Sequence, residues 1–303
     1  MSVATDAAAG RRLLTVAVRR IMAVAVIAAW TGVGNAGVDV YALWDYGRPD
    51  LSEARFRAAL ATAYGDDALI LRTQIARTYS LRRRFDDAYA ELDAIAAAVG
   101  RAGDAAKVHA LLERGRTHRS AGRPADARPL FEAAVETAER AGLERLAADA
   151  LHMIALVEPT VDGQIAWHRR TIAYARGASD PAARGWQAPA LNNLGNTLRD
   201  AGRLAEALAA FREAEAAYAA RTPNAPDSEP VLIARWQVAS TLRRLGRLDE
   251  ALAIQQALEA AFAARGTPDP YVFEELALLH EARGDAAQAA SYRQRQREAT
   301  AGR

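Results

Sequence analysis

Amide side chains cluster at one point of the chain, where Asn192 and Asn196 are four residues apart and Asn193 lies between them. Four residues are about one turn of an α-helix, so in a helix Asn192 and Asn196 share one face. An asparagine amide donates and accepts hydrogen bonds at once, as a peptide backbone does. These residues therefore suit the binding of an extended chain. The alternative is that they are polar surface residues that only favour solubility.

Arginines at the corresponding points of other segments supply a second chemistry. The guanidinium group is planar and can form two parallel hydrogen bonds to a carboxylate. A surface rich in arginine would therefore select an acidic segment, whereas the alternative is that these arginines are ordinary solvated residues. The residues that we expect beside the asparagines are Arg77, Arg116, Arg199, Trp236 and Arg243.

The patterns of common catalytic and metal sites are missing from the sequence. Cysteine is absent, and none of the five histidines forms a His-Glu-x-x-His pair, so we expect no metal. His118 and His280 fall at apolar positions of the helical pattern, where we expect them to face the core. There is no Gly-x-Ser-x-Gly motif, no phosphate-binding loop and no acidic calcium loop. We therefore expect a protein without enzymatic activity and without a cofactor.

A repeat of about forty residues positions these side chains. The recurring alanines are Ala88, Ala127, Ala166, Ala207, Ala251 and Ala289, with spacings by subtraction of 39, 39, 41, 44 and 38 residues. Twelve residues before each alanine, a position that we call the small slot, stand Ala76, Gly115, Ile154, Gly195, Ala239 and Ala277. Five residues before each alanine stand Arg83, Gly122, Val161, Gly202, Gly246 and Gly284. A fixed period of this size predicts stacked helical hairpins, with a turn at the frequent glycine.

The best-defined repeat runs from 191 to 208 and resembles the tetratricopeptide repeat (TPR), a helix-turn-helix unit. The resemblance covers about residues 66–297 and is poorest in the third repeat, where Ile154 fills the small slot. The long period and the Asn-Asn-Leu-Gly-Asn string resemble kinesin-light-chain-like repeats of a bacterial type. The resemblance implies an all-α, right-handed superhelical solenoid of antiparallel helix hairpins, with about six repeats. Its first helices would line a concave groove.

The resemblance also implies a function. In relatives that bind peptides, asparagines in these positions hold the peptide backbone, so the same role is implied for Asn192 and Asn196, with Asn193 beside them. We expect a non-enzymatic scaffold or adaptor that binds an extended, acidic segment of a partner protein in the groove, with these side chains facing solvent in the free protein. Two alternatives stay open. The protein could be a self-associating structural scaffold, or an accessory subunit of an envelope enzyme or secretion complex.

Composition limits the classes of partner. Hydrophobic residues make up 51% of the chain and charged residues 25%, which is ordinary for a soluble protein. The formal net charge is +2 and there is no dense basic run, so we expect no nucleic acid as partner. Without cysteine, the sequence does not report the redox compartment.

The first 37 residues differ from the rest. Two pairs of arginines precede an apolar run over residues 21–30, and a stretch of small residues ends at Ala36. This order is typical of a secretory signal peptide, and the apolar run is too short to span a bilayer. We expect an exported, periplasmic protein; the alternative is a cytoplasmic protein whose translation starts downstream. Residues 32–37 also match Gly-x-Gly-x-x-Gly, but no strands flank them, so we expect no dinucleotide there.

The two ends of the repeat array are expected to be atypical. Residues 38–65 predict an N-terminal capping hairpin whose Tyr41, Leu43 and Trp44 pack over the first full repeat. Asp50 followed by Glu53 predicts a capping box at the start of its helix. Residues 298–303 are expected to form a short tail.

Overall fold

The computed structural model describes residues 37–301, and this part of the chain is all-α. The predicted signal peptide and the glycine motif at its end therefore lie outside the described residues, apart from Gly37. None of the described helices is long and apolar enough to cross a membrane. The chain divides into two compact units, Met1–Trp186 and Gln187–Arg303, a division of which the sequence period gave no sign.

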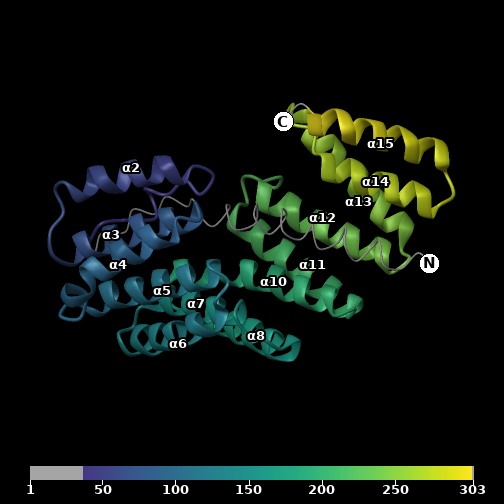
Figure 1. The fold of residues 1–303 in the computed structure, drawn as a ribbon. Helices are drawn as coiled ribbons and strands as arrows, with labels where there is room; N and C mark the ends of the chain where they lie inside the picture. The colour runs from purple at the N-terminus through teal and green to yellow at the C-terminus, as the bar shows by residue number, and fades with distance from the viewer. Residues whose placement is uncertain (1–36, 302–303) are drawn as a thin grey trace. The chain divides into compact units, whose positions relative to one another are not determined.

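The first unit contains an entry helix and three antiparallel hairpins, α3–α4, α5–α6 and α7–α8, followed by the short helix α9 (Figure 1). Its helices are α2 (Pro49–Leu60), α3 (Gly65–Leu81), α4 (Phe85–Val99), α5 (Asp104–Ser120), α6 (Pro124–Arg140), α7 (Glu144–Ala155), α8 (Val161–Gly177) and α9 (Pro181–Arg184).

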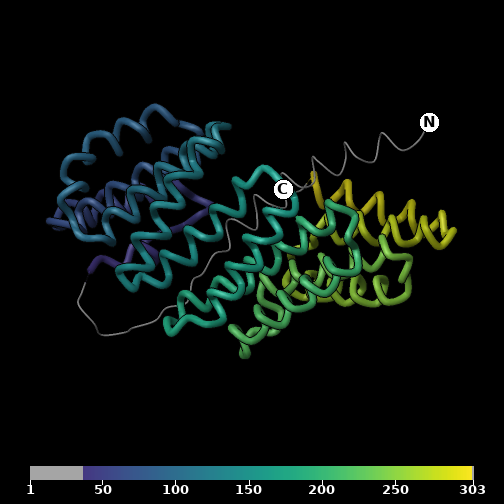
Figure 2. Tube along the Cα trace, turned by 90° about the horizontal axis from the view of Figure 1, so that it is seen from below, coloured from purple at the N-terminus to yellow at the C-terminus, as the bar shows by residue number. Residues whose placement is uncertain are grey.

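The second unit contains three further hairpins, which follow one another along the Cα trace (Figure 2). Its helices are α10 (Gln187–Asp200), α11 (Leu204–Arg221), α12 (Glu229–Arg244), α13 (Leu248–Ala264), α14 (Pro270–Ala282) and α15 (Ala286–Ala301). The hairpin order confirms the fold class predicted from the period.

The turns inside the hairpins lie where the repeat predicted them in five of the six repeats. The turn residue has a positive φ in each of these five, from 76° to 80° at the glycines and 62° at Arg83. Glycine has no Cβ to oppose this conformation, whereas a non-glycine residue there is strained. The turn residues are Arg83, Gly122, Gly202, Gly246 and Gly284.

The small slot lets the two helices of a hairpin approach closely. A Cβ atom at Gly115 would lie 2.5 Å from the ring of Phe131, and one at Gly195 would lie 2.5 Å from the ring of Phe211. Both rings are fully buried. Each phenylalanine therefore fills the space that its partner glycine leaves, which is why small and aromatic residues share this register.

The third repeat departs from the predicted register. Val161 begins α8 instead of forming a turn, and Thr160 caps that helix by accepting a hydrogen bond from Gly163 N at 3.1 Å. Ala166, the recurring alanine of this repeat, is exposed, and Ile165 is buried in its place. The third repeat, where the resemblance is poorest, has its own register because this turn has no left-handed glycine and its helix starts from a threonine cap.

The two ends also differ from their predictions. Residues 38–48 form turns, so the region 38–65 holds the single helix α2 instead of a hairpin. Its predicted capping box is absent, because Asp50 pairs with Arg48 and Glu53 with Arg57. Residues 298–301 continue α15 instead of forming a tail. As predicted, the aromatic residues of 38–48 pack against the first full repeat.

Candidate functional site

The predicted site residues lie on the first helices of the hairpins. We call the surface formed by α3, α5 and α7 the first-helix face of unit 1, and that formed by α10, α12 and α14 the first-helix face of unit 2. Arg77 and Arg116 lie on the first, and the other predicted residues lie on the second. The two groups belong to different units, so each face has its own arrangement of partners.

On unit 1 the predicted arginines are bound to carboxylates. Arg77 Nη1 donates to Glu113 Oε1 at 3.1 Å, and Arg116 Nη1 donates to the same oxygen at 2.5 Å. Arg116 also forms an ion pair with Asp149 on α7. Burial alone would raise the pKa of Asp149, but Arg116 opposes this effect and the pKa lies below its usual value. These arginines join neighbouring hairpins and are not solvated residues.

Arg119 is the exception on this face. It lies one turn after Arg116 and is half-buried, and its side chain has no hydrogen-bond or ion-pair partner among the described residues. Burial lowers its pKa, and the neighbouring charge of Arg116 lowers it further. Desolvating a cation without a counter-ion is unfavourable, so Arg119 would be stabilised by an added carboxylate.

On unit 2 the predicted residues also bridge neighbouring helices. Arg199 on α10 donates to Gln237 on α12. Arg243 donates from Nε to Glu275 Oε2 at 2.8 Å, and Trp236 Nε1 donates to the carbonyl oxygen of Tyr271 at 3.2 Å. Burial lowers the pKa of Arg199, and the neighbouring Asp200 opposes the effect only in part, while the partner on the next helix is a neutral amide.

The asparagines are buried, which corrects the expectation that they face solvent. Asn192 is 1% exposed and Asn196 9% exposed, whereas Asn193 is half-buried. Neither Nδ2 nor Oδ1 of Asn192 has a hydrogen-bond partner, and Oδ1 of Asn196 has none either, among the described residues. The sequence did not indicate this burial, because asparagine is mostly an exposed residue.

A recurring polar position in the sequence marks the acceptors of most cross-helix bonds. The residue two positions before the small slot is polar in all six repeats. Four of these residues are acceptors: Glu113, Gln237 and Glu275 accept the arginine bonds described above, and Gln74 accepts the indole N–H of Trp44. These polar residues are Gln74, Glu113, His152, Asn193, Gln237 and Glu275.

The histidines are arranged differently from the prediction. His118 and His280 are only half-buried and lie near Asp126 and Asp285, with nitrogen–oxygen distances of 3.7 and 3.4 Å. The fully packed histidines are instead in unit 1. Burial lowers the pKa of each of them, to about 4, about 4 and about 3. They are, in that order, His109, His152 and His168.

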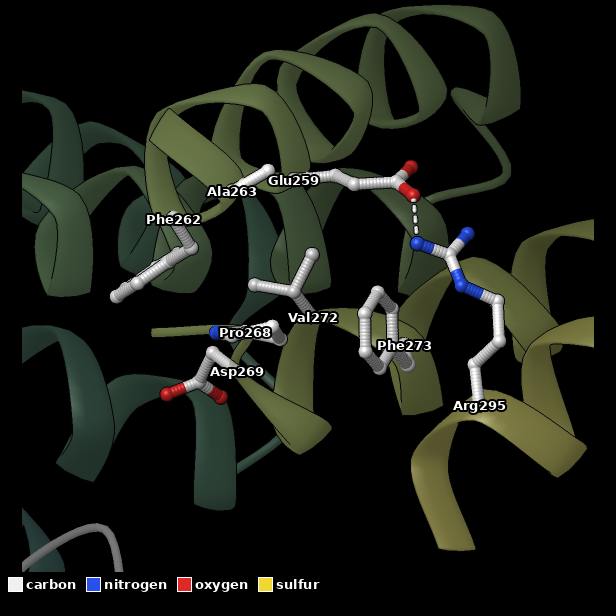
Figure 3. A pocket seen from close by; sticks show the side chains of 8 residues that line it. All are labelled: Glu259, Phe262, Ala263, Pro268, Asp269, Val272, Phe273 and Arg295. Atoms are coloured by element: carbon white, nitrogen blue, oxygen red, sulfur yellow. Dashed lines mark ion pairs between the residues drawn. The ribbon is translucent and has the colours of Figure 1, made fainter. Parts of the chain in front are cut away.

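A small apolar pocket lies between α13, α14 and α15 (Figure 3). Phe262, Val272 and Phe273 line it, and Arg295 pairs with Glu259 at 2.5 Å at its edge. Its volume of about 40 Å³ has room for only a few water molecules, whereas small-molecule sites have several hundred cubic ångströms. In the described part of the chain, no three His, Asp or Glu side chains are grouped as metal ligands.

Comparison with known proteins supports the repeat assignment. A family model described as Tetratricopeptide repeat matches residues 108–141 and 188–218, which lie in α5–α6 and α10–α11. No curated protein matches the chain in sequence.

Solved structures share the fold. The nearly identical TPR-like repeats of a protein from Podosopora anserina described as a kinesin light chain are 17% identical, with a TM-score of 0.54, over 64% of this chain and 95% of theirs. The apo form of RapI is 11% identical, with a TM-score of 0.68, over 88% and 75%. BtubC (BKLC) from P. vanneervenii is 15% identical, with a TM-score of 0.55, over 79% and 92%. Two hairpins of this chain thus match the tetratricopeptide repeat, and its described hairpins have the fold of kinesin-light-chain-like repeats.

Proposed function

We propose that this protein is a non-enzymatic scaffold that binds an extended segment of a partner protein on the first-helix face of unit 2. TPR proteins mediate protein and peptide binding, and their scaffold is generally non-catalytic. Stacked hairpins present a long surface on which an extended chain can lie. The partner is a protein or peptide, and neither a nucleic acid nor a small-molecule cofactor belongs to the proposal.

The unpaired amides of α10 are the observation that carries the proposal. Leaving a buried donor or acceptor without a partner costs about 1–3 kcal/mol. Asn192 leaves two such atoms unpaired and Asn196 one, and the two side chains are one helical turn apart. A peptide backbone offers N–H and C=O groups at a spacing that can satisfy both side chains. Binding would thus remove a cost that the free protein bears.

Access to the two asparagines differs. Asn196 is nearer to solvent, whereas Asn192 is covered, so a partner reaches Asn192 only after the atoms over it move. Half-buried Trp236 on the neighbouring helix α12 offers apolar contact to a side chain of the partner. We therefore propose that binding at Asn192 is coupled to a local rearrangement of this face.

An acidic partner segment is part of the proposal, and Arg199 supports it best. Arg77, Arg116 and Arg243 already have buried carboxylate partners, so their charges are offset inside the protein. Arg199 has the neutral Gln237 on the next helix and only the partly exposed Asp200 beside it. A desolvated guanidinium in this setting favours a carboxylate from a partner.

A binding experiment tests this function. Partners captured from native lysate by the wild-type chain would be identified by mass spectrometry and covered with overlapping synthetic peptides. We expect Asn196→Ala to weaken acidic and neutral peptides alike, by about five- to a hundredfold, because the amide contacts backbone. Arg199→Gln should weaken only the acidic peptides and reduce their salt dependence. Unchanged affinities in both variants would overturn the proposal.

Export remains a separate proposal, supported by the order of basic, apolar and small residues in the first 37 positions. Mass spectrometry of the native protein should find an N-terminus near Gly37. A peptide that retains residues 21–30 would contradict cleavage. A native chain that starts downstream in the cytoplasm would favour the alternative start.

A further inference from the structure

Residues 38–46, which we call the strap, cover the first-helix face of unit 1. The indole of Trp44 is only 4% exposed, and Val40 is buried beside it. Both belong to a core cluster with Leu71 and Ile75 of α3. The strap therefore packs where an external segment would have to lie in order to contact α3 and its neighbours.

Aromatic side chains of the strap meet polar groups of this face in a specific way. Trp44 Nε1 donates to Gln74 Oε1 at 3.0 Å, and Gln74 Nε2 lies 3.3 Å from His109 Nδ1 on α5. The rings of Trp44 and Tyr46 stack with centroids 4.7 Å apart and planes 2° apart. The Arg77 guanidinium carbon lies 5.4 Å from each of these ring centroids. This face thus binds a pair of aromatic residues two positions apart.

A third aromatic contact extends the strap as far as α7. The guanidinium carbon of Arg145 lies 3.1 Å from the centroid of the Tyr41 ring. Burial raises the pKa of the Tyr41 hydroxyl, although the nearby Arg145 opposes the effect. One short segment therefore contacts α3 through Trp44 and α7 through Tyr41.

The strap is held on α3 and α7 by side chains. Its hydrogen bonds to other backbone groups among the described residues are those of its own turns, such as Leu43 N to Val40 O at 3.3 Å and Trp44 N to Tyr41 O at 3.3 Å. Its backbone is tied to side chains of α2: Asp45 N donates to the Ser52 hydroxyl at 2.7 Å, which donates to Asp45 O at 2.9 Å, and Arg55 donates to Leu43 O at 3.5 Å. The side-chain contacts to α3 and α7 can be replaced by those of another chain with the same residue types.

We propose that the strap is a ligand of unit 1 supplied by the chain itself, and that it closes this face to partners. A partner binds to the first-helix face of unit 1 by displacing the strap. Its extended segment places two aromatic residues, two positions apart, on Gln74 and Arg77. This regulation rests on the proposed function, because it assumes that the first-helix faces bind segments of partner proteins. Binding of a partner segment to the first-helix face of unit 2 does not depend on the strap.

A labelled peptide with the sequence of residues 37–48 tests the proposal directly. Its binding to the full chain would be measured by fluorescence anisotropy. We expect the variant Trp44→Ala/Tyr46→Ala to bind the peptide at least about tenfold more tightly than the wild type, because its own strap competes less. A peptide with alanine at both aromatic positions should not bind. The control is Tyr64→Ala, which removes a tyrosine of the same unit that is 87% exposed and should bind like the wild type.

A second measurement on the wild type decides the question even if the double variant does not fold. Hydrogen exchange reports how often the strap opens. We expect the Leu43 and Trp44 amides to exchange at least about tenfold faster than the central amides of α3, because the strap is released while the helices stay folded. Exchange of strap and α3 at one common rate would overturn the proposal, as would a folded double variant that fails to bind the peptide.

The two proposals can fail separately. If the peptide binds the double variant while the affinities of captured partners are unchanged by Asn196→Ala and Arg199→Gln, the strap proposal holds and the proposed function of unit 2 is wrong. If those unit 2 variants lose partner binding while the strap shows no local release, the function holds and the strap is a permanent part of the core.

Discussion

The first-helix faces of the two units share one repeat register but satisfy their polar groups differently. On unit 1, Glu113 and Asp149 pair with arginines, and the strap bonds to Gln74. On unit 2, buried amide atoms of Asn192 and Asn196 remain without partners. Directly after the small slot, Arg116 of unit 1 is paired inside the protein, whereas Asn196 of unit 2 has an unpaired oxygen that is available for binding. The distinction lies in the side chain that the next helix brings opposite.

Acidification should separate the units most strongly. His109, His152 and His168 all lie in unit 1, and burial lowers their pKa to about 4, 4 and 3, from 6.5. Between about pH 6.5 and pH 4 the unfolded chain therefore binds more protons than the folded one, so stability falls as pH falls. Each histidine contributes about 1 kcal/mol per pH unit.

Hydrogen exchange resolved by peptide, corrected for intrinsic rates, would measure this difference. Unit 1 should lose protection below pH 6 before unit 2 does. His168→Leu should flatten the pH dependence of unit 1. Equal loss in both units would mean that these histidines are not buried as described.

Removing a cross-helix arginine should have a larger effect in unit 1 than in unit 2. Arg116→Leu leaves Asp149 buried without its cation and Glu113 with Arg77 alone, which costs about 3–5 kcal/mol at pH 7. Arg199→Leu leaves the neutral Gln237, so we expect about 1–3 kcal/mol. Chemical denaturation measures both values. The cost of Arg116→Leu should shrink as pH falls, because protonation neutralises the stranded carboxylates; equal costs in the two variants would contradict the comparison.

The hairpin cores should respond alike in both units. Gly115→Ala and Gly195→Ala each place a Cβ atom 2.5 Å from a buried phenylalanine ring. Overpacking of this kind costs about 1–3 kcal/mol. Thermal unfolding should show similar losses for the two variants, and the paired changes Phe131→Leu and Phe211→Leu should recover part of each loss. A large difference between the units would show that their cores are not equivalent.

The smallest expected effect is a gain. Asn192→Leu and Gln255→Leu each remove a buried amide whose two polar atoms have no partner among the described residues. Both variants should be more stable by about 1 kcal/mol. Only Asn192→Leu should weaken partner binding, because Gln255 lies on α13, the second helix of its hairpin, and not on the first-helix face. Differential calorimetry and the peptide titration together check this; equal binding losses would remove the special role of α10.

The repeat period of about forty residues predicted most of the fold. Small slots and turn glycines recur along the chain, so the hairpins, their order and five of the six turns could be predicted from sequence. The register of the third repeat could not be predicted, because Val161 and Ile154 break the pattern and a threonine cap replaces the glycine turn. The period also did not reveal that residues 38–48 would form turns over α3, since an irregular segment has no periodicity to detect.

The sequence predicted which helices carry the site residues, but not whether their side chains are buried or paired. Arg77, Arg116, Arg199 and Arg243 do lie on first helices, yet their exposure and charge depend on the facing residue of the next hairpin. For Arg77, Arg199 and Arg243 that information is present two residues before the next small slot, whereas Arg116 pairs with Asp149, five residues before it. The sequence alone does not identify these acceptors, because a buried glutamate such as Glu113 looks like any surface residue of a helix until its partner is known.

The cross-helix bonds also determine which hairpins can be neighbours. Arg77 reaches from α3 to Glu113, and Arg243 reaches from α12 to Glu275. If α5–α6 were excised, the corresponding residue of the next hairpin, His152, would replace Glu113 opposite Arg77. A carboxylate contact would be lost and a buried cation left behind. The hairpins are thus not interchangeable modules, and recombination that inserts, deletes or reorders one of them would have to change the acceptor residue at the new junction as well.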